Sequence, residues 1–307
     1  MKNKILVTGG AGNIGSALVA KLISETENYV VVVDDLSTGS LSKLPSAKSE
    51  NLKFFKCDVN NYDAIKTIMK EFQFDYVFHF AAVVGVQRTQ QFPIKVLEDI
   101  EGIRNLLNLA VDTLVKKVYF SSSSEVYGEP VELPQHEIRT PLNSRIPYAV
   151  VKNVGECFFR SYYQHYGLNY TIFRFFNTYG PSQSVDFVVS RFLAAALKGE
   201  DITIYGDGSQ TRSFCYVDDL VEGIYRLLMS NYALPVNIGN PDEISLKDFA
   251  EEILKLTGAQ QKISYKPLPV DDPKQRKPDI SKAKEILGWE PKVNRAEGLK
   301  KIGRAHV

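Results

Sequence analysis

Tyr148 and Lys152 are four residues apart in the segment Tyr148-Ala-Val-Val-Lys152. On a helix, side chains at positions i and i+4 lie on one face, about a turn apart. A phenol beside an ammonium group loses its proton more readily, so a tyrosine with an ordinary pKa near ~10 can become a base at neutral pH. This spacing is also typical of an amphipathic helix with one buried aromatic residue. It therefore indicates a redox site only if other parts of such a site are present in the sequence.

Glycines near the N-terminus form a second candidate site. They lie in the segment Thr8-Gly9-Gly10-Ala11-Gly12-Asn13-Ile14-Gly15, between an apolar run over 4–7 and a helical pattern that starts near Leu18. The order of strand, glycine turn and helix is the one in which a helix N-terminus binds the pyrophosphate of a dinucleotide. The residues predicted to bind such a cofactor are Gly9, Gly12, Asn13, Ile14 and Gly15.

An acid after the second apolar run strengthens this prediction. The run 29–33 ends in Asp34, at about the ~20-residue offset where a carboxylate reaches the adenosine ribose. The same acid repels a 2′-phosphate, which favours NAD over NADP. Ala81 and Ala82 follow the apolar run 76–79 and are expected on the same rim of the sheet, beside the cofactor.

The composition describes an ordinary globular protein. Its 307 residues are 44% hydrophobic and 24% charged, with a formal net charge of +1, which gives no argument for a nucleic acid or a membrane as the main partner. We find no apolar run of ~18 residues and no signal peptide, and we expect a cytoplasmic location. The 3 cysteines and 4 histidines lack metal-ligand spacing, so no metal site is predicted.

Strand and helix patterns alternate along the chain. We expect strands near 4–7, 29–33, 52–56, 75–80, 115–121 and 170–175, which predicts an α/β fold with a doubly wound parallel Rossmann sheet. We assign 1–176, with a return segment 213–235, to a cofactor domain, and 177–212 with 236–302 to a smaller, discontinuous α/β substrate domain. Ser245 and Asp248 predict the start of a helix that ends at Gly258, and the last five residues fit no periodicity.

Several of these segments together resemble the extended short-chain dehydrogenase/reductase family, whose members act on nucleotide-activated sugars with NAD. The resemblance covers nearly the whole chain and is carried by Thr8–Gly15, His79-Phe-Ala-Ala82, Ser121-Ser-Ser-Ser-Glu-Val-Tyr-Gly128, Tyr148-x-x-x-Lys152 and Arg174-Phe-Phe-Asn-Thr-Tyr-Gly-Pro181. It implies a homodimer and catalytic roles for Ser123, Tyr148 and Lys152. Tyr148 would take a proton from the sugar O4, and Lys152 would hold the nicotinamide ribose.

The resemblance also implies contacts to the two nucleotides. Asp58 and Val59 match the family's contact with adenine, although an acid there is also typical of a simple turn. Asn177 matches its diphosphate-binding asparagine. Arg212 and Arg191 are expected to add positive charge for the substrate phosphates, because arginine binds phosphate oxygens with two parallel hydrogen bonds.

Among the branches of this family, the chain is most similar to the UDP-glucuronate decarboxylases. The similarity lies in the Ser-Glu-Val-Tyr-Gly loop that contains Glu125, in Arg145, and in Arg276-Lys-Pro-Asp-Ile280. It implies that Arg276 binds the sugar carboxylate and that Glu125 supports proton delivery to C5. A 4,6-dehydratase would need an acid where Ser124 stands, and a 4-epimerase needs no carboxylate at Glu125, which would then be a loop residue facing water.

Two loops depart from that branch. The residues inside Tyr148-x-x-x-Lys152 are Ala-Val-Val, and the loop after the fourth strand reads Val83-Val-Gly-Val-Gln-Arg88. Both loops are expected to border the sugar, and Arg88 is a candidate for contact with a different substituent. The function alternatives are therefore a UDP-sugar 4-epimerase, a nucleotide-sugar dehydratase, and an NAD-binding sensor without turnover.

Overall fold

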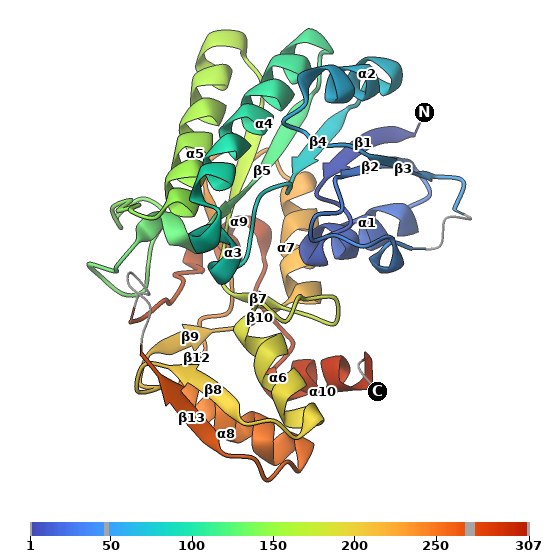
Figure 1. The fold of residues 1–307 in the computed structure, drawn as a ribbon. Helices are drawn as coiled ribbons and strands as arrows, with labels where there is room; N and C mark the ends of the chain where they lie inside the picture. The colour runs from blue at the N-terminus through green and yellow to red at the C-terminus, as the bar shows by residue number, and fades with distance from the viewer. Residues whose placement is uncertain (1, 46–48, 268–273, 306–307) are drawn as a thin grey trace.

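A parallel sheet is the centre of the molecule (Figure 1). The computed structural model describes residues 2–45, 49–267 and 274–305, so 268–273 of the predicted substrate domain lie outside it. Within these residues the large sheet has seven strands in the order β11-β6-β5-β4-β1-β2-β3. They are β1 (Asn3–Thr8), β2 (Asn28–Asp34), β3 (Leu52–Lys56), β4 (Tyr76–His79), β5 (Lys117–Ser123), β6 (Tyr170–Phe175) and β11 (Val236–Ile238). The predicted Rossmann-type sheet is confirmed.

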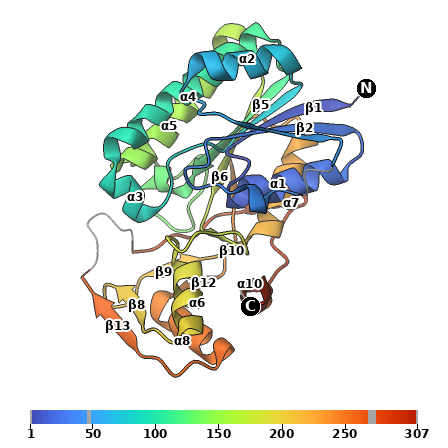
Figure 2. The ribbon, with the colours of Figure 1, turned by 45° about the vertical axis from the view of Figure 1, so that its right-hand side comes forward.

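Helices cover both faces of this sheet (Figure 2). One face packs against α1 (Asn13–Ser24) and α7 (Val217–Leu228), and the other against α2 (Tyr62–Phe72), α4 (Pro93–Asp112) and α5 (Pro147–Tyr166). Neighbouring strand residues point to opposite faces, so Ile5 and Val7 join the first core and Leu6 joins the second. Short helical segments at the sheet rim are η1 (Leu41–Lys43), α3 (Val86–Gln91) and η2 (Ser124–Tyr127).

A smaller lobe lies below the carboxyl ends of the strands in Figure 1. It contains α6 (Val188–Lys198), β8 (Ile202–Tyr205) paired with β13 (Ile263–Lys266), and α8 (Leu246–Thr257). Short pairs connect the lobes: β9 (Thr211–Ser213) with β12 (Glu243–Ser245), and β7 (Thr178–Tyr179) with β10 (Cys215–Tyr216). The predicted cap of α8 is confirmed, since Ser245 Oγ accepts the Asp248 N–H at 3.0 Å and Gly258 follows with φ +70°.

Two segments differ from the sequence-based expectation. We expected β11 in the smaller domain, but it pairs with β6 as the edge of the large sheet, where its fully buried Val236 and Ile238 complete the core. After α9 (Ser281–Leu287) the chain forms a further helix that the sequence pattern did not predict, α10 (Arg295–Ala305). Its apolar positions are too few for a clear periodic pattern, yet Leu299 and Ile302 are buried. The last two residues, 306–307, lie outside the described part.

The described part of the chain contains no helix with the length and apolar character that a bilayer span requires. It also contains no group of three or more His, Cys, Asp or Glu side chains arranged to hold a metal ion. Cys57, Cys157 and Cys215 are free thiols.

Candidate active site

The glycine turn between β1 and α1 is shaped for close approach of a ligand backbone. Gly9 has φ +67°, and a Cβ there would lie 2.6 Å from the Ala81 nitrogen. Gly12 is the N-cap of α1. The backbone N–H groups of the first helical turn, which starts at Asn13, therefore have no acceptor within the helix. They give this end of the helix a partial positive charge that can bind an anion. These features fit the pyrophosphate of a dinucleotide.

Asp34 ends β2 beside this turn. Its carboxylate is buried and accepts the Ala11 N–H at 3.0 Å and the Leu36 N–H at 2.8 Å. Burial raises the pKa of Asp34, and the two backbone hydrogen bonds oppose this. Each carboxylate oxygen has a second lone pair, so Asp34 can hold the turn and still accept ribose hydroxyls.

The other predicted cofactor residues lie along the same edge of the sheet. Ala81 follows β4, and its N–H donates to Thr8 Oγ1 at 3.4 Å; Ala82 lies next to it. Asp58 is exposed after β3 and accepts the Asn60 N–H at 2.9 Å, the contact of a turn acid. Val59 is buried in the core. A purine contact at 58–59 stays a prediction.

The end of β5 and the start of α5 bring the three predicted catalytic residues together: Ser123, Tyr148 and Lys152. Ser123 is the last residue of β5, and its Oγ accepts the Glu125 N–H at 3.2 Å. Its hydroxyl also favours the ionised form of the Tyr148 phenol and so lowers the pKa of Tyr148. The buried Lys152 Nζ lies 5.6 Å from the centroid of the Tyr148 ring and donates to Ser121 Oγ at 3.5 Å. Burial lowers the pKa of Lys152 to about 8.

We had predicted that Lys152 lowers the pKa of Tyr148, and the surroundings of the phenol contradict this prediction. Burial raises the pKa of Tyr148, and the nearby Glu125 carboxylate raises it further. The hydrogen bond with Ser123 and the charge of Arg276 act in the opposite direction. The phenol is therefore protonated at neutral pH in this arrangement, because an anion is costly to bury without a close cation.

Glu125 and Arg276 form a two-point ion pair close to Tyr148. Glu125 lies in η2, whereas Arg276 belongs to the segment before α9, 151 residues later. Nη1 donates to Oε1 and Nη2 donates to Oε2, and the Arg276 side chain is only 7% exposed. We had predicted both residues for the site but not their contact, which depends on how the later segment docks on the large lobe.

The remaining predicted arginines are dispersed. Arg212 is buried on β9, and Nη1 donates to the Thr211 carbonyl at 2.8 Å. Arg191 on α6 lies over the Tyr205 ring at 5.3 Å, and its buried Nε has no hydrogen-bond partner among the residues that the structure describes. Arg88 on α3 donates to the Ser37 carbonyl at 3.2 Å, which places it by the loop after Asp34. Arg145 is exposed.

Asn177 lies between β6 and β7, and its backbone carbonyl accepts the Cys215 N–H at 2.8 Å. This contact holds the crossing point between the two lobes. No described hydrogen bond fixes its side chain, so the diphosphate contact of Asn177 stays a prediction.

Comparisons with known proteins agree with this geometry. The family model described as GDP-mannose 4,6 dehydratase matches residues 6–302. The chain belongs to this family. It is 40% identical to UDP-glucuronic acid decarboxylase 6 of Arabidopsis thaliana over 307 residues, which covers 96% of this chain and 86% of the relative. The family members therefore include enzymes that remove a carboxyl group from a nucleotide sugar, and this protein is an enzyme of that family.

Solved structures of the family superpose on the whole chain. A UDP-glucose 4-epimerase of Thermotoga maritima with UDP-glucose has a TM-score of 0.94 at 33% identity and covers 99% of this chain and 98% of its own. A UDP-glucuronic acid 4-epimerase of Bacillus cereus, solved with UDP-glucuronic acid and NAD, has a TM-score of 0.90 at 30% identity, with 98% of each chain covered. One fold thus supports different outcomes at the sugar.

Two acids near the site, one half-buried and one fully buried, were not predicted. Asp99 on α4 accepts the Val83 N–H at 2.8 Å, and burial raises its pKa to about 6 beside the positive charge of Lys152. Glu156 on α5 is fully buried and pairs with Arg174. The sequence contained a signal for each: Asp99 shares the helix face of Val96 and Ile103, and Glu156 continues the i, i+4 row of Tyr148 and Lys152.

Proposed function

We propose that the protein is an NAD-dependent UDP-glucuronate decarboxylase that works through transient oxidation at the sugar C4. The observation that carries the proposal is the Glu125–Arg276 pair beside Tyr148. The Glu125 backbone N–H donates to Ser123 Oγ at 3.2 Å, and the charges of Glu125 and Arg276 both act on the pKa of Tyr148. A sugar that reaches Ser123 and Tyr148 with O4 would therefore meet Arg276 with its C5 substituent. A guanidinium is the side chain best shaped to bind a carboxylate.

NAD would be held by Gly9, Gly12, Asn13, Ile14, Gly15 and Asp34, with Ala81 and Ala82 on the rim and Lys152 at the nicotinamide end. The cofactor supplies the hydride acceptor for C4 and carries a positive charge when oxidised. Ser123 orients the C4 hydroxyl. Tyr148 is a protonated phenol in the arrangement described above, and the positive charge of bound NAD would favour its phenolate form, which then takes the O4 proton as the C–H electrons leave. The product of this first stage is a 4-keto sugar whose C5 carboxylate has become a β-keto acid.

Arg276 and Glu125 act in the second stage. The C5–C6 bond breaks, carbon dioxide leaves, and the electron pair moves into an enolate at C4 and C5. When the substrate carboxylate replaces Glu125 on Arg276, the freed Glu125 carboxylate can take a proton from water and deliver it to C5. Return of the hydride to C4 and of the proton from Tyr148 to O4 completes the turnover, so the cofactor ends as it began.

A UDP-sugar 4-epimerase is the second candidate. Two 4-epimerases superpose closely on the chain, and one of them was solved with UDP-glucuronic acid. In such an enzyme the same C4 oxidation is followed by return of the hydride to the other face, and Arg276 would only anchor the carboxylate. A dehydratase is less favoured, because Ser124 is too weak an acid to protonate a departing hydroxyl.

We also propose a homodimer through α4 and α5, with UDP bound by Asn177, Arg191 and Arg212. The two helices pack together on one face of the sheet, and their apolar side chains remain partly uncovered: Ile94 is 69% exposed and Tyr166 is 55% exposed. A second copy of these helices would bury that surface. The cytoplasmic location and the absence of a nucleic-acid partner stay predictions from the sequence, and Arg88 and Arg145 stay candidates for sugar contacts.

A panel of substrates tests the proposed reaction. The enzyme with NAD is incubated separately with UDP-glucuronate, UDP-glucose and UDP-N-acetylglucosamine, and products are identified by mass and proton NMR. UDP-glucuronate should lose about 44 mass units, as carbon dioxide, and Arg276→Ala should greatly slow this loss because the carboxylate has no cation to bind. Constant mass with a changed C4 proton coupling would instead identify a 4-epimerase, and a loss of ~18, one water, would identify a dehydratase.

A further inference from the structure

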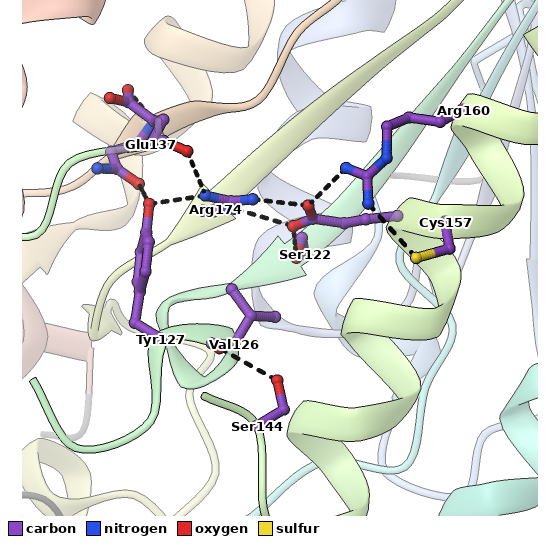
Figure 3. Close-up of polar contacts among 10 residues, drawn as sticks. Ser122, Val126, Tyr127, Glu137, Ser144, Cys157, Arg160 and Arg174 are labelled. Atoms are coloured by element: carbon purple, nitrogen blue, oxygen red, sulfur yellow. Dashed lines mark hydrogen bonds and ion pairs between the residues drawn. The ribbon is translucent and has the colours of Figure 1, made fainter. Parts of the chain in front are cut away.

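A buried polar network lies behind the candidate active site (Figure 3). At its centre, the Arg174 guanidinium on β6 donates from Nε to Glu156 Oε1 at 2.9 Å and from Nη2 to Oε2 at 2.7 Å. Nη1 donates to the Tyr127 hydroxyl at 3.0 Å, and Ser122 Oγ donates to Glu156 Oε1 at 2.7 Å. All four side chains are at most 2% exposed. Satisfied networks of this kind fix the relative positions of the segments they join.

Three of the four members lie close in sequence to a residue of the active site. Ser122 precedes Ser123 on β5, and Tyr127 ends the short helix that contains Glu125. Glu156 lies one helical turn after Lys152 on α5. The network therefore joins three segments that carry catalytic side chains, although none of its own members belongs to the proposed chemistry.

Asn237 extends the network toward Arg276. The Tyr127 hydroxyl donates to Asn237 Oδ1 at 2.7 Å, and Asn237 Nδ2 donates to the carbonyls of Gln135 at 2.8 Å and Asp279 at 3.2 Å. Gln135 in turn donates its N–H to the Lys277 carbonyl at 2.7 Å. Asn237 is fully buried on β11, so this edge strand connects the core of the large lobe to the segment that carries Arg276.

We propose that Tyr127 and Asn237 are positioning residues that hold Arg276 and Glu125 in register with Tyr148. This inference rests on the proposed function, in which the carboxylate and O4 of one sugar are bound at the same time. A displacement of about 1 Å between such groups can cost ~10²-fold in rate. The Tyr127 hydroxyl accepts from Arg174 and donates to Asn237, so it joins the two halves of the network through side chains. Glu137 makes a second connection, because its carbonyl accepts from Arg174 Nη1 at 3.1 Å and its Oε1 accepts the Asn237 backbone N–H at 2.8 Å.

The test removes that hydroxyl alone. In Tyr127→Phe the ring still packs against Phe176, and the holoenzyme is mixed with UDP-glucuronate in single turnovers. Release of labelled carbon dioxide should fall ~10- to 10²-fold, while reduced nicotinamide forms at the wild-type rate and accumulates. A merely structural role would slow both steps together. Equal slowing of both steps, or no change in either, would overturn the proposal.

Tyr119→Phe is the matched control. Tyr119 is also fully buried on β5, but its hydroxyl faces the Leu228 carbonyl at 3.5 Å, on the side of α7. Both rates should be unchanged in this variant. Asn237→Leu, which keeps the volume but removes the bonds to Gln135 and Asp279, cuts the network at its other link. It should reproduce the selective loss of carbon dioxide release.

Hydrogen exchange separates this inference from the proposed function. The Gln135 and Asp279 amides are bonded to the Lys277 and Gln135 carbonyls, and both should exchange faster in Tyr127→Phe but not in Tyr119→Phe. This measurement needs no substrate. If the wild type releases no carbon dioxide, the proposed function fails while exchange still tests the network, and unchanged exchange in Tyr127→Phe would refute the positioning role.

Discussion

In the cofactor half of the site, Tyr148 and Lys152 lie one turn apart on a single helix, whereas in the carboxylate half Glu125 and Arg276 are 151 residues apart in sequence. The first arrangement is fixed as soon as α5 forms on the sheet. The second requires that the segment before α9 dock against η2. The hydride chemistry can therefore stay constant in this fold while the residues that meet the C5 substituent change, as the family's epimerases and decarboxylases illustrate.

Tyr148→Phe should have the largest effect and should disable both halves of the reaction. It removes the acid/base hydroxyl, so turnover should fall by ~10² to 10⁴, with no reduced nicotinamide formed. Arg276→Ala, in contrast, should still reduce NAD with UDP-glucuronate but release little carbon dioxide. Stopped-flow absorbance of reduced nicotinamide distinguishes the two variants. Retention of most of kcat in Tyr148→Phe, at unchanged thermal stability, would exclude this tyrosine from the mechanism.

The difference between the halves also explains what the sequence could predict. The cofactor half was accessible because its spacing is local: a glycine turn between strand and helix, an acid after the next strand, and an i, i+4 pair. The positions of six strands along the chain and the cap of α8 followed from similarly local patterns. Glu125 and Arg276 were named by resemblance, but no local pattern indicates that two residues so far apart form an ion pair.

The incorrect expectations have a common physical cause. β11 is a strand of the large sheet because Val236 and Ile238 find space beside β6, and α10 is stable because Leu299 and Ile302 pack into the core. Tertiary packing decides both, and local propensity does not. The Tyr148 pKa was misjudged for a related reason, since the effect of burial depends on everything around the phenol and not only on Lys152.

The next largest predicted effect is the loss of stability in acid, which we attribute to His79 in the cofactor half of the site. The ring lies at the end of β4, where its Nδ1 is 2.8 Å from Thr8 Oγ1, and burial lowers its pKa from 6.5 to about 3. Between these two pKa values, His79 is protonated in the unfolded chain but neutral in the folded protein. The free energy of unfolding is therefore unaffected by protonation of His79 above pH 6.5. It falls as the pH falls, by about 3 kcal/mol near pH ~4.

Urea unfolding of the wild type and of His79→Gln across this range measures that contribution. The variant should lose less stability on acidification, whereas His165→Gln, an exposed change at the end of α5, should follow the wild type. Parallel pH profiles for all three proteins would show that His79 does not govern the acid sensitivity.

Asp34→Ala should have the smallest effect of the variants, and it tests the cofactor half of the site alone. The carboxylate has two functions: it accepts the N–H groups of Ala11 and Leu36, and we expect it to accept the ribose hydroxyls of NAD. Loss of charge-assisted hydrogen bonds of this kind weakens binding by about 1.5 to 3 kcal/mol, so the Kd for NAD should rise ~10-fold or more. A loosened turn would weaken the binding of NADP equally, but removal of the negative charge relieves repulsion of its 2′-phosphate.

Calorimetric titration with both cofactors should therefore show a lower preference for NAD over NADP in Asp34→Ala, with carbon dioxide release restored at saturating NAD. An unchanged ratio of the two Kd values would mean that Asp34 only holds the glycine turn, and that selection between the cofactors comes from another part of the loop.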